Sequence, residues 1–251
     1  MKHSPLLMCL AAWLVIPAAQ ADLTLIGRSS LTSLNMPNHG REALYVKGHQ
    51  LRRDLTSRGR SFSYLYDLKK KQITVIDHFQ RQVERLPLDS GKATAKGLKL
   101  DLKATGRKHE MQDWICEEQD LAATLPSQLG EEKVTVVLDG QVWLERKTPH
   151  RTQVAPFVKA VEADDFFVGA ATPGQNASAQ AIGINEVMRQ ILGKGMVCAA
   201  EVQLRYEGSG PMADLGRRMA TRAGMVFESV ADQPLKDEVF MVPAGYQDVR
   251  R

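Results

Sequence analysis

Serines, histidines and paired acids are the residues of this sequence that could carry out chemistry, and their spacing does not predict an active site. A nucleophilic enzyme needs an activated Ser, Cys or Lys beside a base that a third group orients. No serine lies in the Gly-x-Ser-x-Gly pattern of an α/β-hydrolase. Lone histidines near turns are usually exposed to solvent, and beyond the first 21 residues the sequence has five isolated ones: His39, His49, His78, His109 and His150.

Adjacent carboxylates are the second candidate for chemistry. Glu117-Glu118, Glu131-Glu132 and Asp164-Asp165 have the residue types for general acid and base catalysis. Such pairs in loops and at helix ends are usually solvated charges. The sequence also lacks a phosphate-binding glycine loop, a Cys-x-x-Cys and a His-x-x-x-His. We therefore expect no catalytic residue, no metal site and no cofactor.

The first 21 residues match a secretory signal peptide. Lys2 and His3 precede an apolar run from Leu6 to Ile16, and Ala19-Gln20-Ala21 fits the small-x-small cleavage pattern. The run is shorter than the roughly 20 apolar residues of a membrane span. Cys9 lies inside the run instead of after it, which argues against a lipid-attached cysteine. We expect cleavage between Ala21 and Asp22, and an exported, soluble protein of residues 22–251 that forms one domain.

Two cysteines, Cys116 and Cys198, remain after removal of the signal peptide. An even pair in an oxidising compartment favours a disulfide. A disulfide between Cys116 and Cys198 would close a loop of 198 − 116 = 82 residues. Such a bridge stabilises a fold by roughly 4 kcal/mol in the chain-entropy model. The alternative is two buried, unpaired thiols. Neither cysteine has a His or a second Cys at the spacing of a metal site.

The charge pattern argues against nucleic-acid binding. The formal net charge of +4 at pH 7 is spread along the chain and forms no clustered basic face. A group of basic residues in the first half could meet an anionic membrane, but ordinary charges on the solvent face are the favoured interpretation. This group comprises Arg52, Arg53, Arg58, Arg60 and the lysines at 69 to 71.

Apolar residues at every second position between residues 42 and 86 predict four or five short antiparallel strands. Phe62, Tyr64 and Tyr66 fall on one face of such a strand, and three lysines then form a polar turn. Further along, Asp139-Gly140 between two apolar runs predicts a hairpin turn within residues 133–146. Met212 to Thr221 fits either period, and we assign it to a strand from its place before the run Met225 to Ala231.

The hydrophobic period changes between residues 156 and 195. Pro156 fits the first turn of a helix. Asn176 or Ser178 fits the cap of a second helix, whose apolar stripe includes Met188 and Ile191 and which ends at Gly193 and Gly195. Helices of this kind cover a sheet face that would otherwise contact water. The sequence thus predicts a mainly β fold, a strongly curved antiparallel sheet of roughly 10 to 12 strands with two or so helices on it.

Several segments together resemble a known exported bacterial family. These segments are YVKGHQLRRD (45–54), SYLYDLKKKQITVID (63–77), Cys116 in a middle strand, and FMVPAGY (240–246). They are similar to a family related to the lipoprotein carriers LolA and LppX. The resemblance implies a periplasmic half-barrel covered by helices, whose apolar interior holds acyl chains. It implies no active-site residue, because the family has no catalytic motif to carry over.

The expected function is therefore a non-catalytic carrier or binding protein. Its ligand would be hydrophobic or lipidated, such as a lipoprotein or another envelope protein. The side chains expected to line the cavity are Phe62, Tyr64, Tyr66, Trp114, Trp143 and Met188. A filled core is the alternative for each of them. An envelope sensor that recognises a protein partner is the second hypothesis, and an envelope enzyme is the third and least favoured.

Overall fold

The computed structural model describes residues 22–33, 36–57, 59–88, 97–112, 114–129, 131–148, 150–160, 179–218 and 221–249. The predicted signal peptide lies outside these residues, as do Asn176 and Ser178. Within the described residues, twelve strands form one sheet, and three α-helices accompany it. The predicted fold class is confirmed.

The strands alternate with short turns in the first half of the chain and become longer in the second half. They are β1 (Leu23–Ser33), β2 (Met36–Lys47), β3 (Gln50–Ser57), β4 (Arg60–Asp67), β5 (Gln72–Asp77), β6 (Gln82–Pro87), β7 (Lys99–Met111), β8 (Trp114–Leu129), β9 (Glu132–Glu145), β10 (Met196–Glu207), β11 (Thr221–Ala231) and β12 (Gln247–Asp248). The helices are α1 (His150–Ala160), α2 (Ala179–Lys194), α3 (Pro211–Arg218) and the 3-10 helix η1 (Asp237–Phe240).

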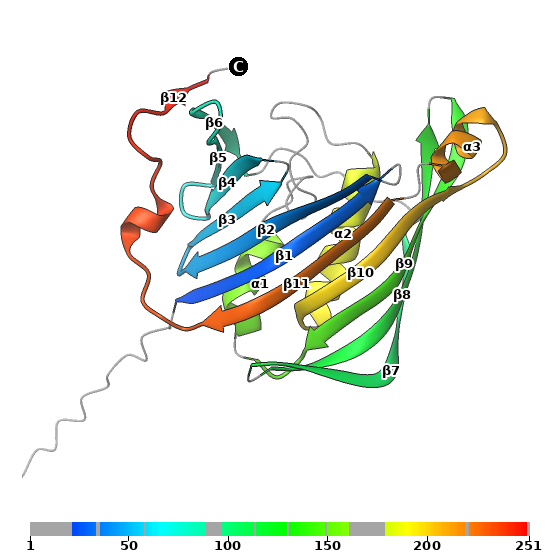
Figure 1. Cartoon of the computed structure of the whole chain (residues 1–251), viewed down its shortest axis with the longest axis horizontal. Coiled ribbons are helices and arrows are strands. Elements are labelled where there is room, and N and C mark those ends of the chain that lie inside the picture. Colours follow the sequence, from blue (N-terminus) through cyan, green and yellow to red (C-terminus); the bar gives the residue numbers. More distant parts are fainter. Residues whose placement is uncertain are drawn as a thin grey trace, which may run out of the picture.

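The sheet has the order β12-β6-β5-β4-β3-β2-β1-β11-β10-β9-β8-β7. All neighbouring pairs are antiparallel except β12 and β6, which are parallel. Strands β7 and β12 form the two edges, so the sheet is not closed among the described residues. Figure 1 shows the sheet bending strongly, with α1 and α2 behind it and α3 beyond one end.

Two apolar clusters join the sheet to the helices. The first cluster combines β1 and the β2–β5 meander with Val154 and Phe157 of α1. The second combines β8, β9 and β10 with Val187 and Ile191 of α2. Burial of apolar surface stabilises a fold by roughly 25 cal/mol per Å². The helices therefore cover the sheet face that the strands could not keep from water by themselves.

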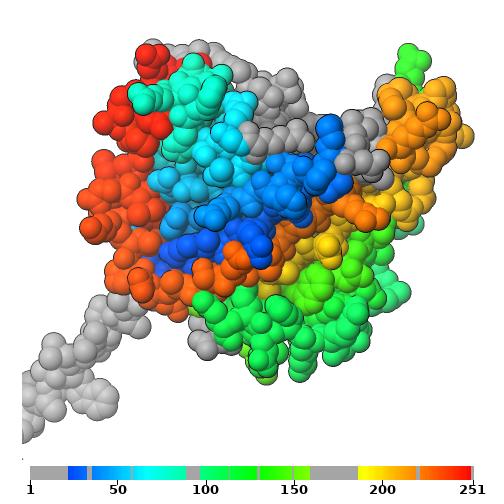
Figure 2. Space-filling view, in the orientation of Figure 1, coloured from blue at the N-terminus to red at the C-terminus, as the bar shows by residue number. Residues whose placement is uncertain are grey.

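The C-terminal segment covers the opposite face of β3 to β6. Val242 and Tyr246 pack on a third cluster of Leu65, Ile76 and Val83. The ammonium group of Lys47 also donates to the side chain of Asp237, 2.7 Å away. In Figure 2 this segment lies along the strands of the first half of the chain. Both faces of β4 are therefore covered, although its sequence pattern predicted a half-buried strand.

The hairpin predicted at Asp139-Gly140 is wrong. Strand β9 continues through both residues, and Gly140 faces Leu121 of β8 and Val202 of β10. Gly140 has a φ of 154°, and a Cβ atom there would collide with the carbonyl oxygen of Glu201. The glycine serves a close approach of two strands and not a turn.

Two predictions about the helices also differ from the structure. Helix α1 begins at His150, so Pro156 lies inside the helix and not in its first turn. The strand predicted for Met212 to Thr221 is wrong, because residues 211–218 form α3. Ala213 and Gly216 are its buried residues, and a Cβ atom on Gly216 would contact the ring of Tyr206. Small residues at this spacing let α3 lie close to β10.

Candidate functional site

Five of the six residues predicted to line a cavity meet in the first apolar cluster. Tyr64, Tyr66 and Trp114 are buried there. Phe62 and Trp143 are partly buried and pack against it. Met188, a residue of α2, packs instead against the second cluster. The structure thus brings the aromatic residues together, and whether they bind a ligand stays a prediction.

The first cluster also contains large side chains that were not among the predicted cavity residues. Phe157 of α1 is fully buried in it, together with Met111 at the end of β7 and Phe227 of β11. The helical spacing of Phe157 was the available signal, since it marks the face of α1 that must pack on the sheet. These residues extend the apolar interior from β4 to β11.

A buried ion pair interrupts this apolar wall. The carboxylate of Glu42 on β2 accepts a hydrogen bond of 2.7 Å from Nε of Arg53 on β3, and their side chains are 8% and 11% exposed. Burial lowers the pKa of Arg53, but the Glu42 carboxylate more than offsets this, so that the pKa lies above its usual value. The interpretation of Arg53 as an ordinary solvent-face charge is therefore wrong.

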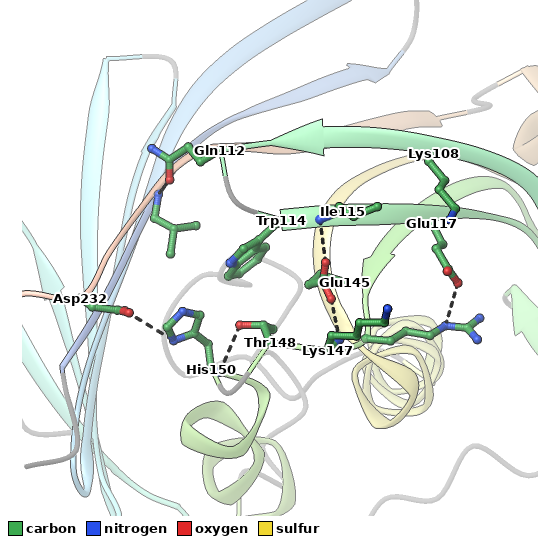
Figure 3. Close-up of a pocket in the computed structure, with 12 residues that line it drawn as sticks. Lys108, Gln112, Trp114, Ile115, Glu117, Glu145, Lys147, Thr148, His150 and Asp232 are labelled. Carbon is green, nitrogen blue, oxygen red and sulfur yellow. Dashed lines mark hydrogen bonds and ion pairs between the residues drawn. The ribbon is translucent and has the colours of Figure 1, made fainter. Parts of the chain in front are cut away.

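A cleft of about 720 Å³ opens beside the first cluster. It lies where β7 turns into β8, where β9 leads into α1 and where β11 ends. Its lining residues are Lys108, Gln112, Trp114, Ile115, Glu117, Glu145, Arg146, Lys147, Thr148, His150, Val230 and Asp232. Figure 3 shows these side chains around the opening. The volume falls within the range of small-molecule sites, roughly 300–1,000 Å³.

Trp114 forms the boundary between the cleft and the apolar interior. Its indole stacks on the imidazole of His150, with ring centroids 5.6 Å apart and an interplanar angle of 28°. Trp114 and Val230 both line the cleft and belong to or pack on the first cluster. On the cleft side, Nδ1 of His150 lies 3.5 Å from the carboxylate of Asp232. The cleft therefore borders directly on the aromatic interior.

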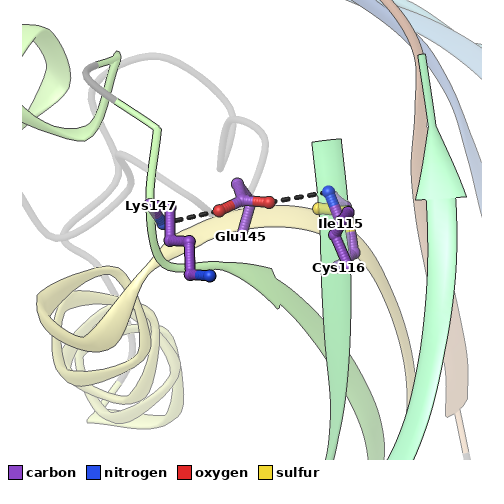
Figure 4. Close-up of a disulfide and its surroundings, with 5 residues drawn as sticks. Ile115, Cys116, Glu145 and Lys147 are labelled. Atoms are coloured by element: carbon purple, nitrogen blue, oxygen red, sulfur yellow. Dashed lines mark hydrogen bonds between the residues drawn. A yellow bond between two sulfur atoms is a disulfide. The ribbon is translucent and has the colours of Figure 1, made fainter. Parts of the chain in front are cut away.

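Glu145 holds two segments of the cleft wall in place. Its carboxylate is buried and accepts hydrogen bonds from the backbone N–H groups of Ile115 and Lys147, at 2.7 and 2.5 Å. Figure 4 shows this carboxylate between the two segments and close to Cys116. Both oxygens of Glu145 are engaged in structure, which makes it a poor candidate for an acid or a base.

The predicted disulfide between Cys116 and Cys198 is present, and the bonded cysteines are fully or almost fully buried. It joins β8 to β10, two strands that lie on opposite sides of β9. Alternate strands of a flat sheet are roughly 9.5 Å apart, whereas the two Cα atoms are 6.4 Å apart. The ladder between β9 and β10 also shifts register at Cys198. The disulfide therefore fixes a sharp bend beside the cleft.

The cleft could not be predicted as a site, because its residues come from three separate segments. Only Trp114 among them was named as a candidate ligand contact. His150 was considered as an isolated histidine, and its partners Trp114 and Asp232 are distant in the sequence. Among the described residues, no three His, Cys, Asp or Glu side chains gather as a metal site requires. No helix within the same residues is long and apolar enough to cross a membrane.

Several solved structures are weakly similar to this chain. A LolA superfamily protein from Nitrosomonas europaea is 9% identical over 88% of this chain and 90% of its own, with a TM-score of 0.30. A DUF1329 family protein from Desulfovibrio piger is 9% identical over 90% and 91% of the two chains, with a TM-score of 0.31. A putative outer membrane lipoprotein-sorting protein domain from Vibrio parahaemolyticus is 9% identical over 89% and 90%, with a TM-score of 0.30.

No family model matches the chain, and no curated protein matches it. At 9% identity and TM-scores near 0.3, we infer no ligand, partner or compartment from the solved structures.

Proposed function

We propose that this protein is a non-catalytic periplasmic carrier or binding protein for a hydrophobic or lipidated ligand. The ligand lies between the curved sheet and the helices α1 and α2. Its apolar part contacts the aromatic side chains of the first cluster, among them Tyr64, Tyr66 and Trp114. The predicted signal peptide and the disulfide support a location in an oxidising compartment.

The observation that carries the proposal is the position of Trp114. Its side chain belongs to the buried aromatic cluster and also lines an open cleft. Sites for small apolar ligands are concave, mostly apolar and few per protein. A cleft that borders on an aromatic interior offers a ligand a route from water into an apolar environment, and transfer of each CH₂ group along it is favourable by roughly 0.8 kcal/mol.

The polar groups of the cleft support binding over catalysis. Glu145 is engaged by two backbone N–H groups, and His150 is stacked on Trp114 while facing Asp232. A catalytic base must lie within hydrogen-bond reach of a nucleophile or of a substrate proton. Among the described residues, the lining includes no serine or free cysteine, and the hydroxyl oxygen of Thr148 accepts a hydrogen bond from the backbone N–H of His150. The groups of this cleft are therefore suited to orient a ligand and not to activate a nucleophile.

Mass spectrometry of lipids extracted from protein purified without detergent tests the proposal. We expect a defined lipid or lipidated molecule in the extract. Val158 of α1 packs partly buried against the first cluster, so Val158→Glu places a carboxylate at the apolar wall and should lower the bound amount severalfold. Thr152→Glu adds the same charge on the exposed side of α1 and should leave the amount of bound lipid unchanged.

Two further measurements keep this test decisive. Near-UV circular dichroism establishes that both variants are folded, and Val158→Thr replaces Val158→Glu if the latter does not fold. An extract with no lipid above the level of an unrelated exported protein would contradict the proposal. A single stable protein partner in place of lipid would instead favour an envelope sensor.

A further inference from the structure

The charges of the cleft are segregated along its length. Lys108 and Arg146 lie beside the carboxylate of Glu117, and Lys147 follows Arg146 along the chain. Lys108 is the cross-strand neighbour of Glu117, and Nε of Arg146 lies 3.6 Å from that carboxylate. Figure 3 shows Lys108 and Glu117 on the side away from Asp232 and His150, with Lys147 between the two sides. The cleft therefore has an excess of positive charge at one end only.

Two ammonium groups at the basic end have no protein partner among the described residues. The side chains of Lys108 and Lys147 form neither an ion pair nor a hydrogen bond there, whereas Arg146 pairs with Glu117 and His150 faces Asp232. The remaining carboxylate, Glu145, is occupied by backbone N–H groups. The cleft thus offers two cations for an external anion.

Apolar side chains continue from the basic end toward the interior. Ile115 is 51% exposed, although it is a large apolar residue, and it lines the cleft next to Trp114. Val230 on β11 lines the cleft and packs against the first cluster. A chain that contacts Ile115, Trp114 and Val230 would pass from the basic end to the aromatic interior. Its burial would remove the exposed surface of Ile115 from water.

We propose that this cleft binds an amphiphile with an anionic headgroup and an acyl chain. Lys108 and Lys147 contact the headgroup, and Ile115, Trp114 and Val230 contact the chain. This inference rests on the proposed function, since the chain enters the same interior, and it adds the charge and position of the headgroup.

Isothermal titration calorimetry with three probes of equal chain length tests the headgroup. Dodecyl phosphate carries the anion, dodecyl maltoside is neutral and dodecyltrimethylammonium is a cation, each used below its micelle concentration. We expect dodecyl phosphate to bind about tenfold more tightly than dodecyl maltoside, with an advantage that falls as salt rises. Inorganic phosphate alone should bind far more weakly, because it lacks the chain.

Charge-neutralising variants locate the headgroup. Lys108→Gln with Lys147→Gln should weaken dodecyl phosphate binding by about tenfold, from two partly solvated ion pairs, and leave dodecyl maltoside binding unchanged. The matched control is Lys99→Gln with Lys103→Gln. These two lysines are exposed on β7, and Lys103 pairs with Asp101 on its own strand. The control removes equal charge and should leave the binding of both probes unchanged.

The outcomes separate this inference from the function on which it rests. Equal binding of the three dodecyl probes, or equal loss in the two double variants, would overturn the headgroup assignment and leave the carrier proposal standing. Binding of inorganic phosphate as tight as that of dodecyl phosphate would identify a site for a free anion and overturn the amphiphile. Absence of binding by every dodecyl probe would overturn both proposals.

Discussion

Glu42 and Arg53 form an ion pair in the apolar interior, with 2.7 Å between the carboxylate and Nε. The pair links β2 to β3 on the face that carries Leu51 and the tyrosines of the first cluster. A buried pair is weak evidence for stability, because desolvation offsets most of the attraction between the charges. Removal of one partner is different, since it leaves the other charge buried and uncompensated.

Glu42→Gln should lower the free energy of unfolding by about 3–5 kcal/mol, because the Arg53 guanidinium then stays buried without its counter-charge. Chemical denaturation monitored by circular dichroism measures the change. The control is Glu42→Leu with Arg53→Met, which removes both charges and should lose much less. A Glu42→Gln variant as stable as the natural protein would show that Arg53 reaches solvent.

Gln119→Met should raise the free energy of unfolding by about 1 kcal/mol. The side chain of Gln119 is 3% exposed, and its Nε2 has no hydrogen-bond partner among the described residues. It lies between Ala104 and Val142 on the neighbouring strands, so a thioether fits the local surroundings. Urea denaturation provides the measurement. The control is Gln141→Met, at a more exposed position on β9, which should change the free energy of unfolding by less than about 0.5 kcal/mol. A lower free energy of unfolding in Gln119→Met would contradict the assignment of Nε2 as a buried group without a partner.

His78 should make stability depend on pH. Burial, and then the charge of Arg52, lower its pKa, while Asp54 and Asp77 act in the opposite direction. The folded state therefore binds this proton less readily than the unfolded state, whose histidine titrates near pH 6.5. The stability that neutral His78 contributes is present above about pH 6.5 and is lost as pH falls through its lowered pKa in the folded state.

The pH effect should act on the C-terminal segment. Nδ1 of His78 lies 2.8 Å from the hydroxyl of Tyr246, and Nε2 lies 2.7 Å from Oγ of Ser63. Urea midpoints at pH 7.5 and 5.5 should differ less in His78→Gln than in the natural protein. His39→Gln, an exposed position on β2, should keep the natural difference. An unchanged pH dependence in His78→Gln would assign the effect to another group.

Removal of the disulfide should strongly destabilise the fold. The bridge closes a separation of 82 residues and joins strands on either side of β9. Cys116→Ala with Cys198→Ala should lower the free energy of unfolding by about 4 kcal/mol in the chain-entropy model. Because the bond also fixes the bend beside Trp114, the double variant should bind dodecyl maltoside more weakly. Full stability and full binding together would show that neighbouring contacts hold the bend alone.

Local patterns were sufficient to predict the architecture. Alternation around Phe62, Tyr64 and Tyr66 follows from the period of a strand, and the neighbouring turns are short, so β3 to β6 could be predicted in order. The pairing of Cys116 with Cys198 followed from their number and the expected compartment. These features depend on a few adjacent residues or on a count, and not on how distant segments meet.

The remaining features depend on contacts between distant segments. Asp139-Gly140 has the composition of a turn, but the close approach of Glu201 on β10 is what requires the glycine. Arginine is a residue type typical of the surface, but Arg53 is paired in the apolar interior with the carboxylate of Glu42 on the neighbouring strand. Trp114 and His150 meet in the cleft although 36 residues separate them in the sequence. The local hydrophobic period does not indicate a contact between residues so far apart.

Photo-crosslinking with a neutral, diazirine-bearing long-chain alcohol is the most direct test of the central claim, that an apolar chain enters the interior of the half-barrel. After irradiation, peptide mass spectrometry locates the labelled residues. We predict label on peptides that contain Tyr64 and Tyr66, Trp114 or Phe157, with competition by dodecyl maltoside. Label confined to exposed apolar residues such as Phe79 and Met36, or no label that dodecyl maltoside displaces, would contradict it.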